Sequence, residues 1–193
     1  MKVLVVHASR YGSTQGIAER IAATLCRQGF ETTVQPAKHA DDPSAYDAVV
    51  IGSAAYYFHW MKDATKFVRR YRHVLANRPV WLFSSGPLGT DLTDAQGRDV
   101  RVATEPKEIA EFKQIIQPRD HRVFFGALDG SKLGFAHGLV LKFAKRAKAP
   151  LPEGDFRDWR DIEAWASSIV QALKVPADEV LSRSDDREAL TVP

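Results

Sequence analysis

The sequence predicts a three-layer α/β sandwich, in which helices cover both faces of a five-stranded parallel sheet with strand order 2-1-3-4-5. Two observations lead to this fold class. Short apolar runs of strand length alternate along the chain with segments of helical periodicity. Several of those runs are apolar throughout, which is typical of strands buried on both faces. Such alternation indicates parallel strands joined by helical crossovers.

The first half of the chain supplies three strands and two helices. Residues 2–8 (KVLVVHA) are β-branched and almost wholly apolar, and residues 46–54 (YDAVVIGSA) are similar, so both are predicted as buried strands. Residues 30–36 alternate in polarity, as an edge strand does. The segment 13–29 has apolar residues at helical spacing and ends at a glycine, a common helix stop. The segment 61–77 is predicted to be a single helix.

The second half completes the sheet and adds three helices. Residues 78–86 are predicted to form the fourth strand. Its proline lies near the start, where the missing N–H group removes no hydrogen bond from the sheet interior. Residues 121–128 form the fifth strand. Helices are predicted at 105–117, at 133–148 and at 158–174, and the last of these is clearly amphipathic.

One domain accounts for nearly the whole chain. The 193 residues are 45% hydrophobic and 26% charged, which is ordinary for a soluble protein and sufficient for a substantial core. We therefore predict a single domain at residues 1–175. Residues 176–193 are polar and lack aromatic side chains, so they are predicted to form a flexible tail.

Charge and cysteine content narrow the function classes. The formal net charge of +3 is far from the dense basic character of a nucleic-acid binder, so we expect no nucleic-acid partner. No spacing typical of metal ligands appears, so no metal is expected. The chain has neither a signal-peptide pattern nor an apolar run of about 20 residues, so a cytoplasmic location is expected. The single cysteine, Cys26, excludes an internal disulfide and is predicted to face the core.

The strand order predicts where a ligand binds. In open parallel sheets, ligands bind outside the carboxyl ends of the strands, at the point where the strand order reverses. In the predicted order, that point lies between strands 2–8 and 46–54. The loops that begin at Ala8 and Gly52 therefore border the expected site.

The loop after the first strand, SRYGST, is rich in hydrogen-bond donors. A helix N-terminus leaves backbone N–H groups unpaired and carries partial positive charge, so it favours a phosphate. Ser9, Ser13 and Thr14 add hydroxyl donors, and Gly12 lets the backbone approach a ligand closely. The alternative is that Ser13 or Thr14 merely caps the helix. Three hydroxyls and a glycine at the reversal point favour phosphate binding.

Two further loops are expected at the same edge of the sheet. The loop after the third strand, GSAAYYFHWM, carries aromatic side chains that suit stacking on a flat ring, or else pack into the core. The loop after the fourth strand, SSGPLGTD, has glycines that permit close backbone approach, or else form a simple Gly-Pro turn. The candidate binding residues of these two loops are Ser53, Ala54, Ala55, Tyr56, Tyr57, Phe58, Ser85, Gly86, Pro87, Leu88 and Gly89.

The first loop resembles the phosphate loop of flavodoxins, whose pattern is Ser/Thr-x-Thr/Tyr-Gly-x-Thr. Ser9, Tyr11, Gly12 and Thr14 match this pattern, and the resemblance extends over residues 1–174. It implies a flavodoxin-like fold that binds FMN, with the phosphate held largely by neutral donors. The residues implied to bind the phosphate are Ser9, Arg10, Tyr11, Gly12, Ser13 and Thr14.

Within that superfamily, the chain resembles the menaquinone-dependent protoporphyrinogen IX dehydrogenase family. The likeness lies in segments 46–71, 124–129 (FFGALD) and 139–169, with Tyr57 and His59 at matching places in the first. It implies an FMN-dependent oxidoreductase of heme biosynthesis that passes electrons from a porphyrinogen to a quinone. His59 is then a candidate catalytic proton donor, or else a packed, hydrogen-bonded histidine.

Two features depart from that family's pattern. Tyr56 stands where the family usually has arginine, and the stretch 89–108 is mixed in charge where the family has a basic insertion. Basic side chains would suit the carboxylates of a porphyrinogen. Two alternatives therefore stay open. One is an electron-transfer flavodoxin, although such carriers are typically strongly acidic, and the other is an NAD(P)H:quinone reductase.

The predicted helix 133–148 raises the question of membrane contact. Between residues 139 and 148, basic residues are interspersed with apolar ones, a pattern of helices that lie on anionic membranes. Peripheral contact of this kind would suit a lipid-soluble quinone. The alternative is an ordinary solvated helix face.

Overall fold

The sheet has the predicted parallel topology. The computed structural model of the chain describes residues 1–129 and 152–175. Its main sheet contains, in spatial order, β2 (Glu31–Pro36), β1 (Lys2–Ala8), β3 (Ala48–Tyr56), β5 (Val80–Ser85) and β6 (Asp120–Phe124). The short strand β4 (His59–Trp60) pairs antiparallel with β3 alone. Because β4 adds no member to the parallel path, the order is the predicted 2-1-3-4-5.

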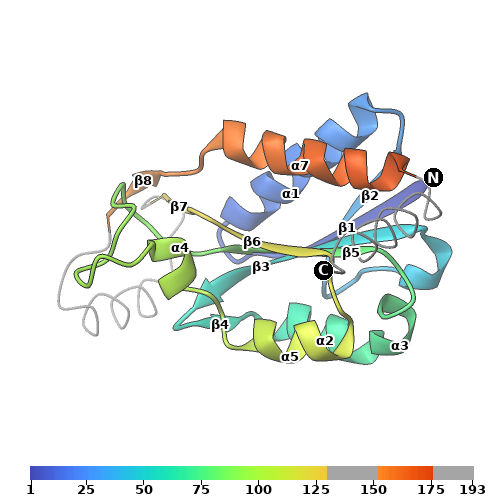
Figure 1. Ribbon diagram of the computed structural model, residues 1–193, viewed down its shortest axis with the longest axis horizontal. Helices are drawn as coiled ribbons and strands as arrows, with labels where there is room; N and C mark the ends of the chain where they lie inside the picture. Colours follow the sequence, from blue (N-terminus) through green and yellow to red (C-terminus); the bar gives the residue numbers. More distant parts are fainter. Residues whose placement is uncertain (130–151, 176–193) are drawn as a thin grey trace, which may run out of the picture.

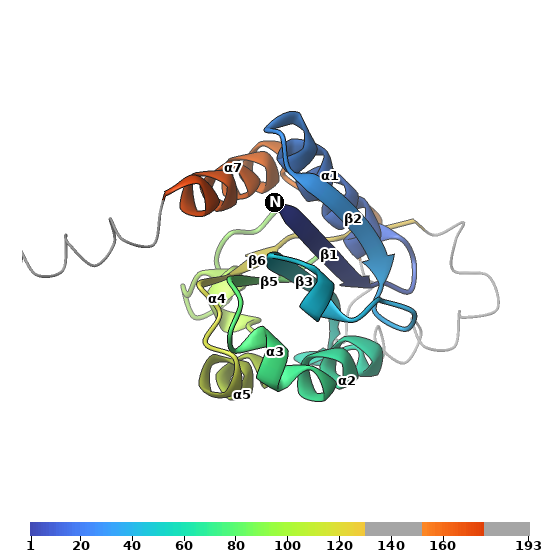
Figure 2. The same ribbon diagram turned by 90° about the vertical axis from the view of Figure 1, so that its right-hand side faces the viewer.

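Helices cover both faces of the sheet and complete the three layers. Figures 1 and 2 show α1 (Ser13–Arg27) and α7 (Trp159–Lys174) on one face, and α2 (Lys62–Arg70), α3 (Arg72–Leu75) and α5 (Glu108–Ile115) on the other. A 3₁₀ turn, Pro43–Ala45, precedes β3. The remaining short elements are α4 (Val100–Ala103), β7 (Ala127–Leu128) and β8 (Gly154–Asp155), which lie together at one end of the sheet in Figure 1.

The strands divide their side chains between two cores, because successive residues of a strand point to opposite faces. From β1, Val3 and Val5 pack in the core below α1 and α7, whereas Leu4 and Val6 pack in the core beside α2 and α5. Trp165 of α7 is almost fully buried, and its indole Nε1 donates to Asp120 Oδ2 at 2.6 Å. The packed layers hold the sheet rigid, so the loops at its end have a fixed base.

Several boundaries differ from those predicted. The helix expected at 61–77 is divided at Tyr71, where φ is −103° and ψ is 17°, and Leu75 beyond this turn is fully buried in the second core. The strand expected at 121–128 ends at Phe124, because the chain beyond it pairs with β8 instead of continuing in the main sheet. Cys26 is exposed and not inward-facing, since Thr24 and Leu25 occupy the buried positions at that end of α1.

Some sequence predictions fall outside the described residues. They are the helix at 133–148, its basic stretch 139–148 and the tail at 176–193. Among the helices that the structure describes, none combines the length and the apolar character needed to cross a membrane.

A substitution at Gly52 tests the packing beneath the site. It lies in β3, where an added Cβ would collide with the Phe83 ring, and that ring is fully buried. Gly52→Ala should therefore lower the free energy of unfolding by about 2 kcal/mol, because an overpacked core forces side chains out of their preferred positions. Urea denaturation measures this loss. The double variant Gly52→Ala/Phe83→Leu should recover part of it, and a Gly52→Ala protein as stable as the wild type would contradict the packing described.

Candidate functional site

A pocket of about 580 Å³ opens at the carboxyl ends of β1, β3 and β5. Most of its surface is apolar, as is usual for small-molecule sites. The predicted residues that line it are Ser9, Tyr11, Ser13, Thr14, Ala54, Ala55, Tyr56, Tyr57, Phe58, Ser85, Gly86, Pro87 and Leu88. Three loops that are distant in sequence therefore meet where the strand order predicts a ligand.

Other predicted residues lie outside this pocket. Gly12 lines a neighbouring polar pocket of about 540 Å³, which shares Tyr11 and Ser13 with the first. Ser53 is fully buried in β3, and its Oγ is occupied by the backbone, because it donates to Ala54 O and accepts from Met61 N. Gly89 lines a third pocket, and Arg10 is exposed.

Part of the pocket wall was not predicted from the sequence. The residues concerned are Val100, Thr104, Val123, Gly126, Ala127, Leu128 and Pro152. They come from α4 and the residue after it, from β6 and the segment that follows it, and from the segment before β8. Their largely apolar character alone gives no functional signal, because apolar residues at such positions usually form core.

The first turn of α1 has the features of a phosphate site. Gly12 is the N-cap residue, with φ +89°, and no side chain caps the helix. The hydroxyl of Ser9 accepts from Gly12 N at 3.1 Å, and that of Ser13 accepts from Ala127 N at 2.8 Å. Each hydroxyl therefore keeps its own proton for a further acceptor. The alternative in which Ser13 or Thr14 caps the helix is not what the structure has.

Two buried hydroxyls beside this turn lack partners. Thr14 Oγ1 and Tyr11 Oη are buried and make no hydrogen bond within the described part of the chain. An unsatisfied buried hydroxyl costs roughly 1–3 kcal/mol, so native proteins seldom leave one without a reason. A ligand that carries several acceptor oxygens would satisfy both hydroxyls and the uncapped N–H groups together.

The aromatic wall of the pocket is a strained hairpin between β3 and β4. Tyr57 and Phe58 have φ values of 53° and 64°, in the left-handed region that costs non-glycine residues roughly 1–2 kcal/mol each. Two hydrogen bonds from the start of α5 hold the hairpin in this conformation. Lys107 N donates to Phe58 O at 3.0 Å, and Trp60 N donates to Glu108 Oε2 at 3.1 Å. Strain of this kind concentrates at functional sites.

Tyr56, at the base of the hairpin, is uncharged at neutral pH. Burial raises the pKa of its phenol to about 12, with a smaller contribution from Tyr11 in the same direction. Tyr56 is therefore a neutral hydrogen-bonding group in the pocket wall.

A buried polar chain fastens the hairpin to the sheet. Trp60 Nε1 donates to Ser84 Oγ at 2.8 Å, and Ser84 Oγ lies 2.9 Å from His121 Nε2. His121 Nδ1 lies 3.0 Å from Glu105 Oε1. Burial lowers the pKa of His121, although Glu105 opposes this. A neutral ring then donates from Nδ1 to Glu105 and accepts from Ser84 at Nε2. The chain links the hairpin to β5, to β6 and to the segment before α5.

His59, the candidate proton donor, does not line the pocket. Its side chain is 52% exposed, and Nδ1 lies 2.8 Å from Glu108 Oε1. Glu108 thus contacts both residues of β4. This geometry gives His59 a part in anchoring the hairpin, while its role as a proton donor stays a prediction.

Comparison with known proteins agrees with this architecture. Residues 4–150 match the family model described as a flavodoxin domain. A flavodoxin from Pseudomonas aeruginosa, solved as a cysteine-to-serine mutant, is similar in structure at 17% identity and a TM-score of 0.57, over 91% of this chain and all of that one. The rubredoxin oxygen:oxidoreductase of Desulfovibrio gigas gives a TM-score of 0.55 at 15% identity, over 90% of this chain and 36% of that chain.

Curated relatives are similar to part of the sequence. The protoporphyrinogen IX dehydrogenase [quinone] of Escherichia coli K12 is 30% identical over 86 residues, which are 44% of this chain. Proteins of the same name from two other Escherichia coli strains match equally. The match spans about half the length of these relatives, 48%.

The buried histidines predict how stability depends on pH. Burial lowers the pKa values of His121 and His7 below the ordinary 6.5. The unfolded chain therefore binds more protons below that pH, so the free energy of unfolding should fall as the pH drops through this region. His121→Asn should reduce this fall between about pH 7.5 and pH 5.5, leaving the part due to His7. Urea denaturation at both pH values measures the difference, and an unchanged slope in His121→Asn would refute the assignment.

Proposed function

This chain belongs to the flavodoxin domain family, and we propose that its pocket binds FMN non-covalently and that the protein is an FMN-dependent oxidoreductase. When bound, the flavin supplies the redox chemistry, and the protein supplies binding, orientation and the surrounding electrostatics. The observation that carries the proposal is the pair of unpartnered buried hydroxyls in the described chain, Thr14 Oγ1 and Tyr11 Oη, beside the uncapped turn of α1.

The residues present fit the two parts of FMN. The phosphate suits the N-terminus of α1, where Ser9, Ser13 and Thr14 offer hydroxyl protons and Gly12 leaves the backbone accessible. The flat ring suits the apolar pocket between the aromatic hairpin and the loop after β5. The apolar wall would exclude water from the ring, and the neutral Tyr56 would add no charge beside it.

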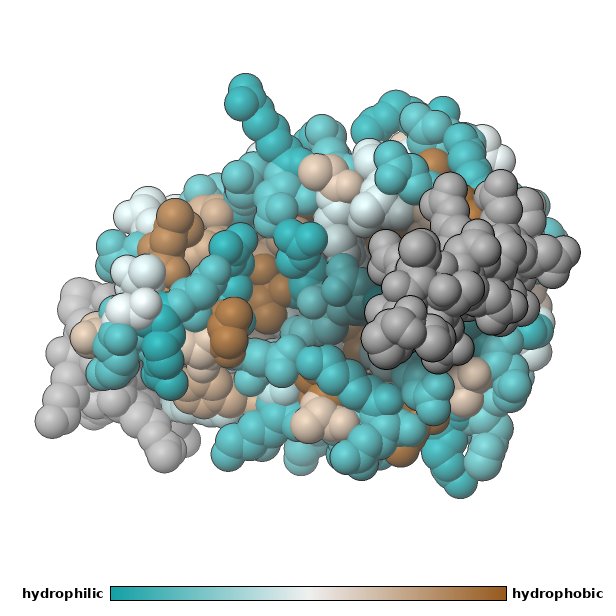
Figure 3. Space-filling view, viewed as in Figure 1, coloured by the Kyte–Doolittle hydropathy of each residue, from teal (hydrophilic) through white to brown (hydrophobic). Residues whose placement is uncertain are grey.

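We further propose a reaction of the protoporphyrinogen–quinone type. The likeness to the Escherichia coli dehydrogenases supports it, although it covers less than half of the chain. The surface near the pocket supports an apolar partner: Phe58, Leu92 and Val102 are 51%, 62% and 75% exposed. In Figure 3, hydrophobic surface gathers at the end of the molecule that carries α4, β7 and β8.

A specific observation favours the two alternatives, an electron carrier and an NAD(P)H:quinone reductase. The arginines that could bind porphyrinogen carboxylates are paired within their own loop. Arg98 Nη2 lies 2.7 Å from Asp94 Oδ2, and Arg101 Nη2 lies 2.8 Å from Asp99 Oδ2. Asp99 accepts hydrogen bonds from Arg101, and these are the main reason that the pKa of its carboxyl is lowered to about 2. The loop therefore offers a dianionic substrate little net attraction.

FMN titration of the purified protein tests the cofactor. The wild type should bind FMN and show the absorption spectrum of a bound flavin. Gly12→Asp should abolish binding, because it places a carboxylate where the phosphate belongs. Gly29→Asp is a matched control: Gly29 also has φ +89° and open space, but it lies at the other end of α1. FMN binding that survives Gly12→Asp, or that is lost equally in Gly29→Asp, would refute the phosphate site.

Anaerobic reduction of the FMN-loaded protein separates the candidates. For the protoporphyrinogen–quinone reaction, protoporphyrinogen IX should bleach the bound flavin and a menaquinone analogue should restore it. Bleaching by NADPH, with none by protoporphyrinogen, would establish the reductase instead. Reduction only by an electron-transfer protein or dithionite would establish an electron carrier.

A further inference from the structure

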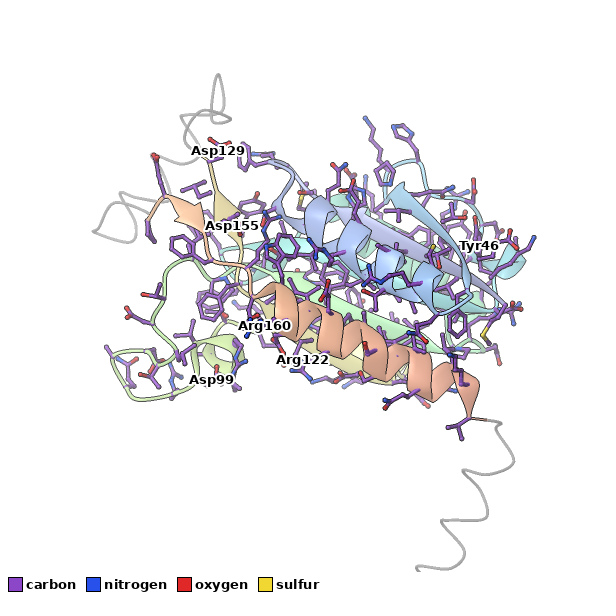
Figure 4. The ribbon with its side chains drawn as sticks, turned by 90° about the horizontal axis from the view of Figure 1, so that it is seen from above. Tyr46, Asp99, Arg122, Asp129, Asp155 and Arg160 are labelled. Carbon is purple, nitrogen blue, oxygen red and sulfur yellow. The ribbon has the colours of Figure 1, made fainter. Side chains whose placement is uncertain are left out.

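Arg157 brings a cation to the first turn of α1 from far along the chain. Its Nη1 donates to Ser13 O at 3.2 Å, across 144 residues of sequence. The guanidinium stacks 4.3 Å above the Trp159 ring and forms two hydrogen bonds to Asp155, at 2.7 and 2.6 Å. Figure 4 shows Asp155 on β8, next to the start of α7 and near the beginning of α1. These contacts fix the guanidinium, whose side chain is only 16% exposed.

The helix itself is built to receive this side chain. A Cβ at Gly16 would lie 2.6 Å from Arg157 Nη1. Gly16 also closes the first hydrogen bond of the helix, from its N–H to Gly12 O at 2.9 Å. Glycine costs a helix interior about 1 kcal/mol relative to alanine. At this position it leaves the space that the guanidinium occupies against the first turn.

A guanidinium at this place depends on nearby anions for its stability. The N-terminus of a helix carries partial positive charge, so a cation beside it is repelled. Asp155 offsets that repulsion in part. A phosphate dianion on the same turn would reverse the sign and make the guanidinium stabilising. Thr14 Oγ1 is fully buried in the same turn and has no partner in the described chain, which is a second observation that points to a ligand at this turn.

We propose that Arg157 is a positioning and specificity residue of the phosphate site, which makes the protein select FMN over riboflavin. It acts in two ways. It holds the Ser13 carbonyl, and so the loop of hydroxyl donors. Its charge also offsets part of the negative charge of Asp129, Glu153 and Asp155, which line the same polar pocket and would otherwise repel a phosphate. This inference rests on the proposed binding of FMN. It adds a cation to a site that the sequence predicts to hold phosphate largely through neutral donors.

The test compares two flavins that share the ring and differ in the phosphate. Flavin fluorescence titrations would give Kd values for FMN and riboflavin, with the purified full chain freed of flavin. The wild type should bind FMN more tightly than riboflavin. Arg157→Ala should weaken FMN binding roughly ten-fold and leave riboflavin binding unchanged, because only FMN carries the charge. Arg157→Lys should retain part of the preference, since it keeps the cation without the paired hydrogen bonds.

Arg20→Ala is the matched control. Arg20 stacks on the same Trp159 ring, at 4.8 Å, and pairs with Glu163, which lies in α7 and away from the phosphate loop. The change should lower stability and leave the ratio of the two Kd values unchanged.

Three outcomes would count against the inference or its premise. If Arg157→Ala weakens both flavins equally, or neither, Arg157 is only structural and the inference fails while FMN binding stands. If Arg157→Ala does not fold, an Arg157→Lys protein whose ratio of the two Kd values equals that of the wild type would also overturn the inference. If the wild type binds neither flavin, the proposed function fails first.

Discussion

Parallel pairing between β1 and β3 is the constraint on which the site depends. The register from Val3–Ala48 to Ala8–Ser53 brings the carboxyl ends of both strands to one edge of the sheet. The loop after β1 then opens into α1, whose first N–H groups face that edge without a side-chain cap. Because β2 lies on the far side of β1, the chain after β1 and the chain after β3 leave the described sheet side by side, with no other strand end between them. The reversal of strand order therefore creates both the pocket and its positive end.

The opposite wall of the pocket, the hairpin between β3 and β4, has a strained backbone. Two successive aromatic residues, Tyr57 and Phe58, are held in left-handed conformations that glycine or asparagine would adopt at lower cost. Glu108 and the buried chain from Trp60 through Ser84 to His121 hold this hairpin in place. Such over-determination is what keeps strained backbone at a binding site from relaxing. Both residues line the pocket, so their rings are available to the flat ring of the proposed flavin.

Much of this could be predicted from the sequence, because the signals are local. The apolar runs at 2–8 and 46–54 determine the buried strands, and SRYGST carries its donors within six residues. The hairpin could not be predicted, since aromatic residues give no sign of positive φ. Arg157 was also missed, because its contact with Ser13 depends on how α7 docks on α1. The use of the Ser53 hydroxyl could not be predicted for a related reason: it accepts from Met61 N and so holds the start of α2.

We propose that one ligand, FMN, spans the turn of α1 and the aromatic hairpin. The most direct measurement is a set of ¹H–¹⁵N NMR spectra of the protein recorded while FMN is added. We expect the amide signals of Gly12, Ser13 and Thr14 and those of Tyr56, Tyr57 and Phe58 to shift together with one dissociation constant. Shifts confined to other parts of the sheet, or no shift at saturating FMN, would contradict it.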